Sequence, residues 1–540
     1  VIGCLEYDPG LVRRTRYTMS FKFGCLVAAI LVLSACAPDA RMSPEIQTAT
    51  LVPTATPTPV ADVLATDRAA GTGSTPSPTP VDVSAGESVP PVSAAYDVTA
   101  LLDWAAKTVH GEQRDEFWNN SASDLREVVM NVDANREPGV FSLERVATGE
   151  KDVTADFTLD GARLSIPLAE VLPPSESVML LLEFDLAVPS IRNGYRWGHL
   201  GYLGYSGRQM NLGMWFPLIA AFDDDAGWIS PQFHSVGEHF VLREADFTVE
   251  LSITGAEDGL RVAGPGTVTR VDTYTWRFEL DGGREMALSV STDFLTLSTT
   301  TASEVKVELF YLPESAQTTL SVPRHALETA AAALTLYEEL YGPYPYSRLA
   351  VVEGDFPDGM EFSGLVFVSG DWFRAWQGVP NDWLTIITAH EVSHQWWYAQ
   401  VGNDQGNYPY LDEALAMYSE ALFFEHVYPE HLDWWWEFRV HAYGPQGYVD
   451  TAVYEYQQVR EYINAVYLQG ALMMDALRSD LGDEAFLEWL QAYARQMRGE
   501  VAGPSDLWGL LQADQLDATR ATRAHYFRKE NVLLRPESLP

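Results

Sequence analysis

Alternation of apolar and polar residues dominates the chain between residues 96 and 297. An apolar side chain at every second position is the pattern of a strand with one buried face. Three such runs are residues 178–188, 247–255 and 273–280. Asp-Gly pairs such as Asp160-Gly161 separate the runs at short intervals, as tight turns do. This region therefore predicts a mostly antiparallel, β-rich domain.

From residue 298 onward the pattern changes to strands followed by helices. Apolar runs that predict strands occupy residues 305–312, 348–355 and 364–370. Residues 326–342 predict a helix that ends at Gly342, because the following Pro343 cannot continue it. Helical spacing then runs through the segment 388–420, and further helices are expected over 464–479 and 483–498. Residues 298–540 therefore predict an α+β domain.

The first 95 residues predict no packed domain. Basic residues precede an uncharged run from Phe23 to Ala35, which is too short to span a bilayer of about 30 Å and predicts a signal peptide over residues 1–35. The run ends in Leu33-Ser34-Ala35-Cys36, which resembles the lipobox of bacterial lipoproteins and implies a lipid on Cys36; an ordinary cleaved signal is the alternative. Residues 36–95 are rich in Pro, Thr and Ser and predict a disordered tether.

Composition narrows the possible partners. At 540 residues the chain is too long for a single core. Its 35 basic and 75 acidic residues give a net charge of −40, which disfavours binding to nucleic acid and fits a soluble surface. The three cysteines all lie within the first 36 residues, so disulfides are not expected to hold the domains together.

Candidate metal ligands lie in the segment 388–420. His390 and His394 are four residues apart, so on a helix their side chains share a face and can bind one metal ion. Glu391 is rotated away by roughly 100°, which places its carboxylate beside the ion, where it can accept a proton from the attacking water. Glu413 begins a second apolar-periodic stretch and supplies a third ligand. Two histidines and one glutamate leave a fourth position open, which is typical of a catalytic zinc site.

Glu420 lies two helical turns after Glu413 on the same face of the predicted helix. It can therefore form a hydrogen bond with the outer nitrogen of a ligating histidine, or be a solvated helix residue. For the whole set, the competing interpretation is a pair of histidines that lie near an acidic helix by coincidence.

These motifs resemble the zinc aminopeptidases of the aminopeptidase N type, the gluzincins. The segment HEVSHQWW, with eighteen residues between its second histidine, His394, and the glutamate of LDEALA, matches their zinc signature. Residues 354–369, GDFPDGMEFSGLVFVS, resemble the family's Gly-x-Met-Glu-Asn strand, and INAVYLQGAL at 463–472 resembles the segment with its catalytic tyrosine. The resemblance implies one zinc ion, a saddle-like β domain and a thermolysin-like catalytic domain. The large C-terminal helical domain of many relatives is expected to be absent.

The resemblance also implies roles for particular residues. Tyr467 would donate its hydroxyl to the oxyanion, with Tyr462 as an alternative. Gly359, Met360 and Glu361 would form an edge strand that pairs with the substrate backbone, and Glu361 would hold the substrate's free ammonium.

The chain departs from the family pattern at two points of amine recognition. Phe362 stands where the family has Asn. The β domain usually supplies a second acid, and in YSGRQMNLGMW the candidates are the neutral Gln209 and Asn211.

The leading hypothesis is a zinc metallopeptidase that removes N-terminal residues from peptides, held outside the cytoplasm by a lipid anchor. A second hypothesis is an endopeptidase or another hydrolase on the same scaffold. A third is a non-catalytic surface lipoprotein that binds peptides. The oligomeric state is left open.

Overall fold

The computed structural model describes residues 92–191, 201–256, 258–316 and 320–528. The predicted signal peptide, the lipobox with Cys36 and nearly all of the predicted tether lie outside these residues. The first strand begins at Val92, so residues 92–95 of the expected tether belong to a strand. None of the helices in the described ranges combines the length and the apolar character that crossing a bilayer requires.

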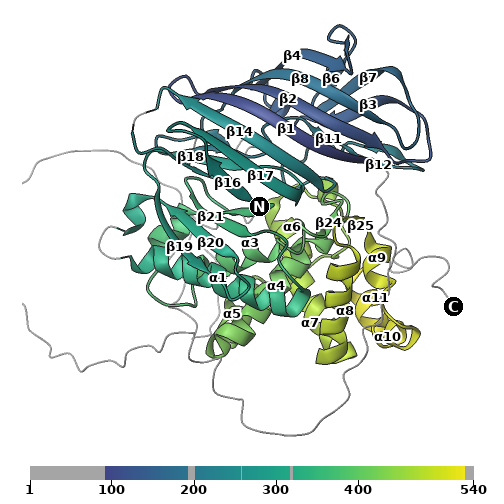
Figure 1. Cartoon of the computed structure of the whole chain (residues 1–540). Coiled ribbons are helices and arrows are strands. Elements are labelled where there is room, and N and C mark those ends of the chain that lie inside the picture. The colour runs from purple at the N-terminus through teal and green to yellow at the C-terminus, as the bar shows by residue number, and fades with distance from the viewer. Residues whose placement is uncertain (1–91, 192–200, 257, 317–319, 529–540) are drawn as a thin grey trace, which may run out of the picture. The chain divides into compact units, whose positions relative to one another are not determined.

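Strands make up the first part of the described chain, and helices follow, as the colours of Figure 1 show. The largest sheet contains, in spatial order, β16 (Thr267–Arg270), β17 (Thr275–Gly283), β14 (Ala245–Thr254), β1 (Val92–Asp103), β2 (Thr108–Asn119), β8 (Ser177–Ala187), β4 (Phe141–Thr148) and β5 (Lys151–Asp152). Its pairs are antiparallel except for β1 with β14. Along β14 and β8, buried apolar residues alternate with more exposed residues, which is the predicted pattern.

Smaller sheets complete the β-rich region. One contains β15 (Arg261–Ala263), β18 (Leu288–Ser291), β10 (Met210–Leu212) and β9 (Leu203–Tyr205). Another contains β11 (Leu218–Ile219), β3 (Leu125–Asn131), β7 (Arg163–Leu172) and β6 (Thr158–Asp160), and β12 (Ala221–Asp223) pairs with β13 (Gly227–Ile229).

A five-stranded sheet opens the α+β region. Its order is β19 (Leu295–Thr300), β20 (Lys306–Tyr311), β21 (Arg348–Gly354), β23 (Leu365–Ser369) and β22 (Met360–Phe362). The expected domain boundary at 297/298 falls within β19. Helix α1 (Ser321–Tyr341) follows β20, and its C-cap residue Gly342 has a positive φ of 118°, which suits glycine. The short helix α2 (Gly370–Ala375) follows β23.

The remaining helices carry or support the candidate metal ligands. They are α3 (Trp383–Ser393), α4 (Glu413–Val427), α5 (Leu432–Trp435), α6 (Val459–Tyr462), α7 (Gln469–Leu481), α8 (Asp483–Gln496), α9 (Pro504–Trp508), α10 (Ala513–Ala518) and α11 (Arg520–Tyr526). The π-helical turn Ile463–Leu468 joins α6 to α7, and the two-residue strands β24 (Gly402–Asn403) and β25 (Val501–Ala502) pair in parallel. The predicted α+β class, a β-rich region followed by a helical region, is confirmed.

Helix α3 is the central element of the α+β region. Its residues from Leu384 to Ser393 are all buried, polar as well as apolar, so the helix is enclosed on every side. The side chain of Asp382 caps its first turn by accepting a hydrogen bond from the Leu384 N–H. It packs against α1, α4 and β23. The helix therefore holds His390 and Glu391 among buried residues.

Arg284 joins the β-rich region to the segment that follows the metal-binding helix. The side chain is buried and donates hydrogen bonds to five backbone carbonyls at 2.5–3.1 Å. The acceptors belong to Leu242, Tyr398, Ala399, Gln400 and Glu500. A guanidinium group can satisfy several acceptors at once because its donors form a planar fork.

Replacement of Arg284 by Met is expected to lower the free energy of unfolding by at least about 3 kcal/mol, because several buried carbonyls would lose their donors. The urea midpoint followed by circular dichroism measures this loss. Arg145→Met is the control, since Arg145 forms an exposed ion pair with Glu183 and its loss should leave the midpoint nearly unchanged. Equal midpoints for the two variants would contradict the role assigned to Arg284.

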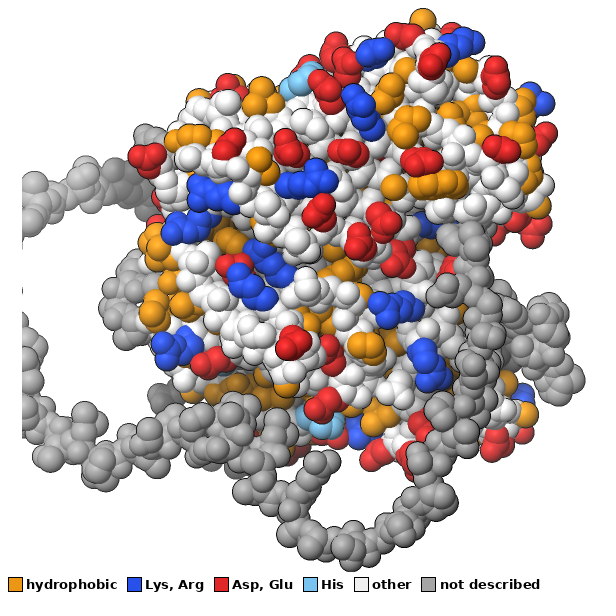
Figure 2. Space-filling view, in the orientation of Figure 1, with side chains coloured by type: hydrophobic (Ala, Val, Ile, Leu, Met, Phe, Trp, Pro, Cys, Tyr) orange, Lys and Arg blue, Asp and Glu red, His pale blue; other side chains and the backbone are white. Residues whose placement is uncertain are grey.

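The excess negative charge does not form one continuous patch on the face seen in Figure 2. Acidic and basic side chains are interspersed there, with single apolar side chains between them. Such a mixed surface fits the interpretation that the net charge of −40 serves solubility.

Candidate metal centre

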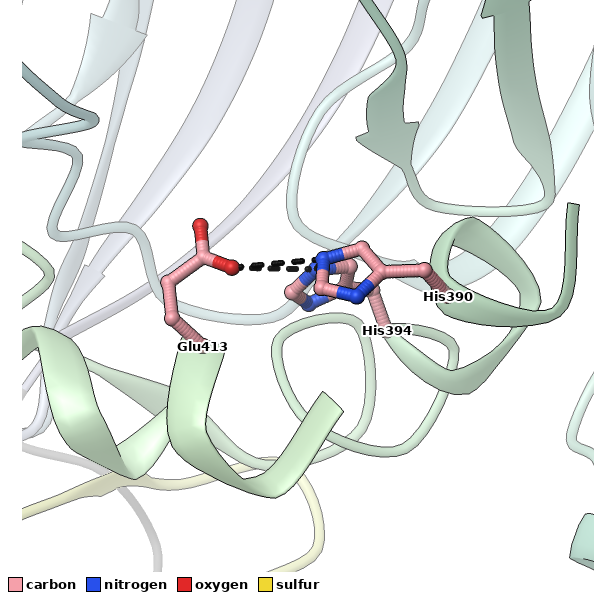
Figure 3. Close-up of side chains that lie close together, drawn as sticks. All are labelled: His390, His394 and Glu413. Atoms are coloured by element: carbon pink, nitrogen blue, oxygen red, sulfur yellow. Dashed lines mark hydrogen bonds and ion pairs between the residues drawn. The ribbon is translucent and has the colours of Figure 1, made fainter. Parts of the chain in front are cut away.

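Three predicted ligands converge from two helices. His390 lies on α3, His394 is the C-cap residue of that helix, and Glu413 is the first residue of α4. The Nε2 atoms of the imidazoles are 3.1 Å apart, and Oε2 of Glu413 lies 3.3 Å from Nε2 of His390 and 3.7 Å from Nε2 of His394. Figure 3 shows the carboxylate pointing at the two rings. The prediction that all three share one site agrees with this geometry.

The residues present fit a zinc ion. Ligands of a tetrahedral zinc with bonds of about 2.0–2.1 Å lie about 3.3 Å from one another, close to the three distances observed. Burial opposes ionisation of Glu413, but the imidazoles of His390 and His394 lower its pKa to about 2, so the group is an anionic ligand. Two imidazoles and one carboxylate leave a fourth position for water or substrate.

The outer nitrogens of both imidazoles are held by carboxylates. Nδ1 of His390 lies 2.8 Å from Oε1 of Glu420, and Nδ1 of His394 contacts Asp412 and the carbonyl of Trp397. A carboxylate on Nδ1 fixes the ring and directs Nε2 to the metal. Of the two interpretations of Glu420, the structure favours the hydrogen bond to a ligand. Sequence reasoning missed Asp412, although it directly precedes Glu413.

Glu420 is itself held as an anion. Burial disfavours its charged form, but the guanidinium of Arg439 and the imidazole of His390 bring its pKa below the usual value. Arg439 donates to both carboxylate oxygens at 2.9 and 3.0 Å, and the Trp435 indole donates to one of them at 2.9 Å. The buried carboxylate therefore has a fixed orientation toward His390.

Glu420→Gln is expected to weaken zinc binding by about 10–100-fold, the usual effect of removing an outer carboxylate partner. Competition with a zinc-selective chelator measures the affinity. Glu425→Gln is the matched control, because Glu425 lies on the same helix but pairs with Arg478 at the surface. Equal affinities of both variants would show that the contact with His390 does not support the metal.

Glu391 lies between the metal ligands and the edge strand. Its Oε1 is 2.0 Å from the point where a Cβ atom on Gly359 would stand, so the carboxylate occupies space that only glycine leaves open without a shift. Burial raises the pKa of Glu391 to about 7, and the neighbouring imidazoles of His390 and His394 counteract this. A carboxyl group with a pKa near 7 is suited to accept and return a proton at neutral pH.

Tyr467 is placed beside the metal ligands by the π-helical turn Ile463–Leu468. Its ring stacks on His390 with centroids 6.0 Å apart and an interplanar angle of 10°. Burial and the charge of Glu413 raise the pKa of Tyr467 well above its usual value, so the hydroxyl keeps its proton. Tyr462 lies edge-on to Tyr467 and can orient it. The placement suits the predicted oxyanion donor.

Of the predicted substrate strand, Met360 and Glu361 lie in β22, an outer strand of the five-stranded sheet, whereas Gly359 directly precedes it. β22 pairs antiparallel with β23 and ends the sheet on that side. The side chain of Glu361 in this strand is buried and accepts a 3.4 Å hydrogen bond from Gln405, which also donates to Asp412 at 2.6 Å. Burial raises the pKa of Glu361 well above its usual value. Such a carboxylate would be stabilised by a bound cation.

Phe362 has a structural role at the position where the family motif has Asn. Its ring lies edge-on to Tyr202 and fills the space in front of Gly213, where a Cβ atom would come within 2.5 Å. Its carbonyl accepts a hydrogen bond from Gln395 at 3.0 Å. The phenyl ring therefore anchors β22 to the β-rich region.

The structure does not support the prediction that Gln209 or Asn211 of the β-rich region binds the substrate's amine. The side chain of Gln209 donates to Ser289 and to the Glu353 carbonyl, and it accepts from the Asp355 N–H, so it holds the loop after β21. Asn211 likewise bonds to the Gly201 carbonyl and to Ser289. Neither side chain is directed to Glu361 by these contacts.

Glu238 is the acid that the β-rich region places in the site. It lies in the connection between β13 and β14, is buried, and offers a carboxylate oxygen within 4.8 Å of oxygens from Glu361 and Glu413. The connection passes against Tyr462, since a Cβ atom on Gly237 would lie 2.8 Å from that ring. Sequence reasoning missed Glu238 because its segment carries no metal-binding motif. The sequence around an isolated acidic residue in a long loop does not predict whether its side chain will be buried.

Comparisons with known proteins agree with this geometry. Residues 325–524 match the peptidase family M1 domain. Endoplasmic reticulum aminopeptidase 2 of Bos taurus is 26% identical over 316 residues, which cover 53% of this chain and 31% of that protein. The chain thus spans about a third of the length of this relative.

Solved structures resemble this chain in fold over both the β-rich region and the α+β region. The M1 zinc metallopeptidase from Deinococcus radiodurans aligns with a TM-score of 0.58 and 17% identity, covering 84% of this chain and 95% of that one. A two-domain M1 zinc metallopeptidase bound to L-arginine aligns with a TM-score of 0.59 and 16% identity, covering 81% and 94%. At this identity the likeness concerns the fold. The three candidate metal ligands lie within residues 325–524, the part of this chain that matches the peptidase family M1 domain.

Proposed function

We propose that the protein is a zinc-dependent aminopeptidase that hydrolyses the first peptide bond of peptides. The observation that carries the proposal is the position of two buried carboxylates, Glu361 and Glu238, within 4.8 Å of the ligand Glu413. When Glu361 and Glu238 hold a free α-ammonium group, the carbonyl of the same substrate residue lies next to the metal site. Only the carbonyl of the first peptide bond of a substrate can then be reached by the attacking water.

The residues of the chain divide the chemical work among them. A bound zinc polarises the peptide carbonyl and lowers the pKa of the attacking water. Glu391 accepts the proton of that water and returns it to the departing amine. Tyr467 donates its hydroxyl to the carbonyl oxygen as negative charge develops on it. The outer edge of β22 aligns the substrate backbone by main-chain hydrogen bonds.

The test compares leucine anilide with the same compound acetylated on its amine. Acetylation is expected to lower kcat/KM at least about tenfold, since it removes a charge-assisted hydrogen bond. Glu361→Gln should lower the rate on the free amine and reduce the difference between the two substrates. A chelator should abolish hydrolysis, and added zinc should restore it.

Two outcomes would favour the rival functions. Equal hydrolysis of free and blocked substrates would indicate an endopeptidase. Absence of zinc-dependent hydrolysis on a panel of aminoacyl anilides and blocked peptides would indicate a peptide-binding protein.

We further propose that the protein is attached to the cell envelope, outside the cytoplasm, through a lipid on Cys36. The lipobox-like sequence and the following tether support this proposal. In cells that process lipoproteins, the wild type should partition into detergent and Cys36→Ser should remain in the aqueous phase. Aqueous partitioning of the wild type would exclude the anchor.

A further inference from the structure

Asp358 is a buried carboxyl group of the site that the proposed reaction does not use. Its exposed fraction is 5%, and its Oδ1 has no hydrogen-bond partner among the described residues. Other buried carboxylates nearby are engaged, as Glu420 is by Arg439 and Asp412 by His394. A carboxylate that is removed from water without a partner is costly, unless a ligand supplies the partner.

The backbone fixes Asp358 in an unusual conformation. Its φ is 87°, in the left-handed region, which aspartate and asparagine adopt more readily than most residues. The residue stands immediately before Gly359, whose position against Glu391 leaves little freedom in this turn. Burial raises the pKa of Asp358 to about 7, and the charges of Glu238 and Glu391 act in the same direction. The carboxyl group therefore lies within reach of the electrostatic field of the site's acidic residues.

The direction of the edge strand indicates which part of a substrate Asp358 faces. Glu361 marks the position of the substrate's amine, and Gly359 lies against the base Glu391, beside the bond that is cleaved. Asp358 directly precedes Gly359, in the turn just before β22 begins at Met360. A peptide whose amine is held at Glu361 and whose cleaved bond lies at Glu391 therefore has the residue after that bond on the side of Asp358.

We propose that Asp358 selects peptides with a basic side chain, lysine or arginine, at the second position. The inference rests on the proposed aminopeptidase function and adds a preference on the leaving side of the cleaved bond. An ammonium or guanidinium group at this position pairs with Asp358 and offsets the cost of its burial.

The experiment measures kcat/KM for the tripeptides Leu-Lys-Ala, Leu-Ala-Ala and Leu-Glu-Ala with the zinc-loaded full chain. The wild type is expected to prefer lysine over alanine by about tenfold or more, the range of a charge-assisted hydrogen bond. Asp358→Asn preserves size and suits the left-handed backbone, and it should bring the lysine-to-alanine ratio close to one. Asp358→Gly, the substitution least demanding of the backbone, should have the same effect. Asp433→Asn, at an exposed position on α5, is the control for loss of one acidic charge and should keep the wild-type ratio.

The outcomes separate this inference from the function on which it rests. If no tripeptide is cleaved by the wild type, the proposed function fails. If the wild type cleaves all three with equal kcat/KM, or if both Asp358 variants keep the preference for lysine, the inference fails and the aminopeptidase function stands. A preference that appears only for lysine at the first position, tested with Lys-Ala-Ala, also overturns the assignment.

Discussion

Glu391→Gln should lower kcat for an aminoacyl anilide by about 10³-fold, within the range that a positioned general base contributes. Glutamine keeps the size and hydrogen-bonding shape of the side chain but cannot accept the proton of the attacking water. Because Glu391 lies beside the ligands and is not one of them, the variant should still bind one zinc per chain. Initial rates, together with metal analysis of the purified protein, test both statements.

The two readouts distinguish loss of the base from loss of the metal. A variant with full zinc content and about 10³-fold lower kcat supports the assignment. A variant with near-normal kcat would mean that another group takes the proton, and Asp358 would then be the first residue to examine, since its charge interacts with that of Glu391.

Glu413→Ala is expected to abolish both zinc binding and hydrolysis. Removal of an outer partner of a ligand costs at most about 100-fold in metal affinity, so removal of a ligand should cost more than that. Without the carboxylate, two imidazoles about 3 Å apart remain, and they hold a zinc ion much less tightly.

Isothermal titration with zinc measures the affinity, and the anilide assay measures the activity. Zinc added to chelator-treated wild type should restore hydrolysis, whereas zinc added to Glu413→Ala should not. Unfolding midpoints of the zinc-free proteins control for a loss of structure. Zinc binding by Glu413→Ala with wild-type affinity would exclude Glu413 as a ligand.

The metal ligands could be predicted because their relationship is local. Four residues separate His390 and His394, and helical geometry alone brings their side chains to one face. Glu413 follows after a short connection and begins an apolar-periodic helix, so few arrangements were possible. Even here the helix α3 ends at Ser393, and His394 is its C-cap residue with helical dihedral angles. The expected spacing survives because the backbone keeps the helical path for one more residue.

The residues that surround the metal were predicted less completely. Glu420 was recognised as a candidate from its two-turn separation from Glu413, but its ion pair with Arg439 depends on how two helices pack. Gln209 was assigned to amine binding, whereas its side chain holds the loop after β21. A neutral amide in a polar stretch gives no sign of which partner it will meet.

By itself, the sequence determined the alternation that builds the strands, the helical period of the segment 388–420 and the three residues that are brought together as candidate metal ligands. These depend on residues a few positions apart, whose geometry the local backbone fixes. Only the tertiary structure decided that Glu238 approaches Glu361, that Arg284 joins two regions and that Asp358 is buried with no hydrogen bond to its Oδ1 from the part of the chain that the structure describes. Burial and pairing of a charge depend on segments more than a hundred residues apart, and no local pattern records which of them will meet.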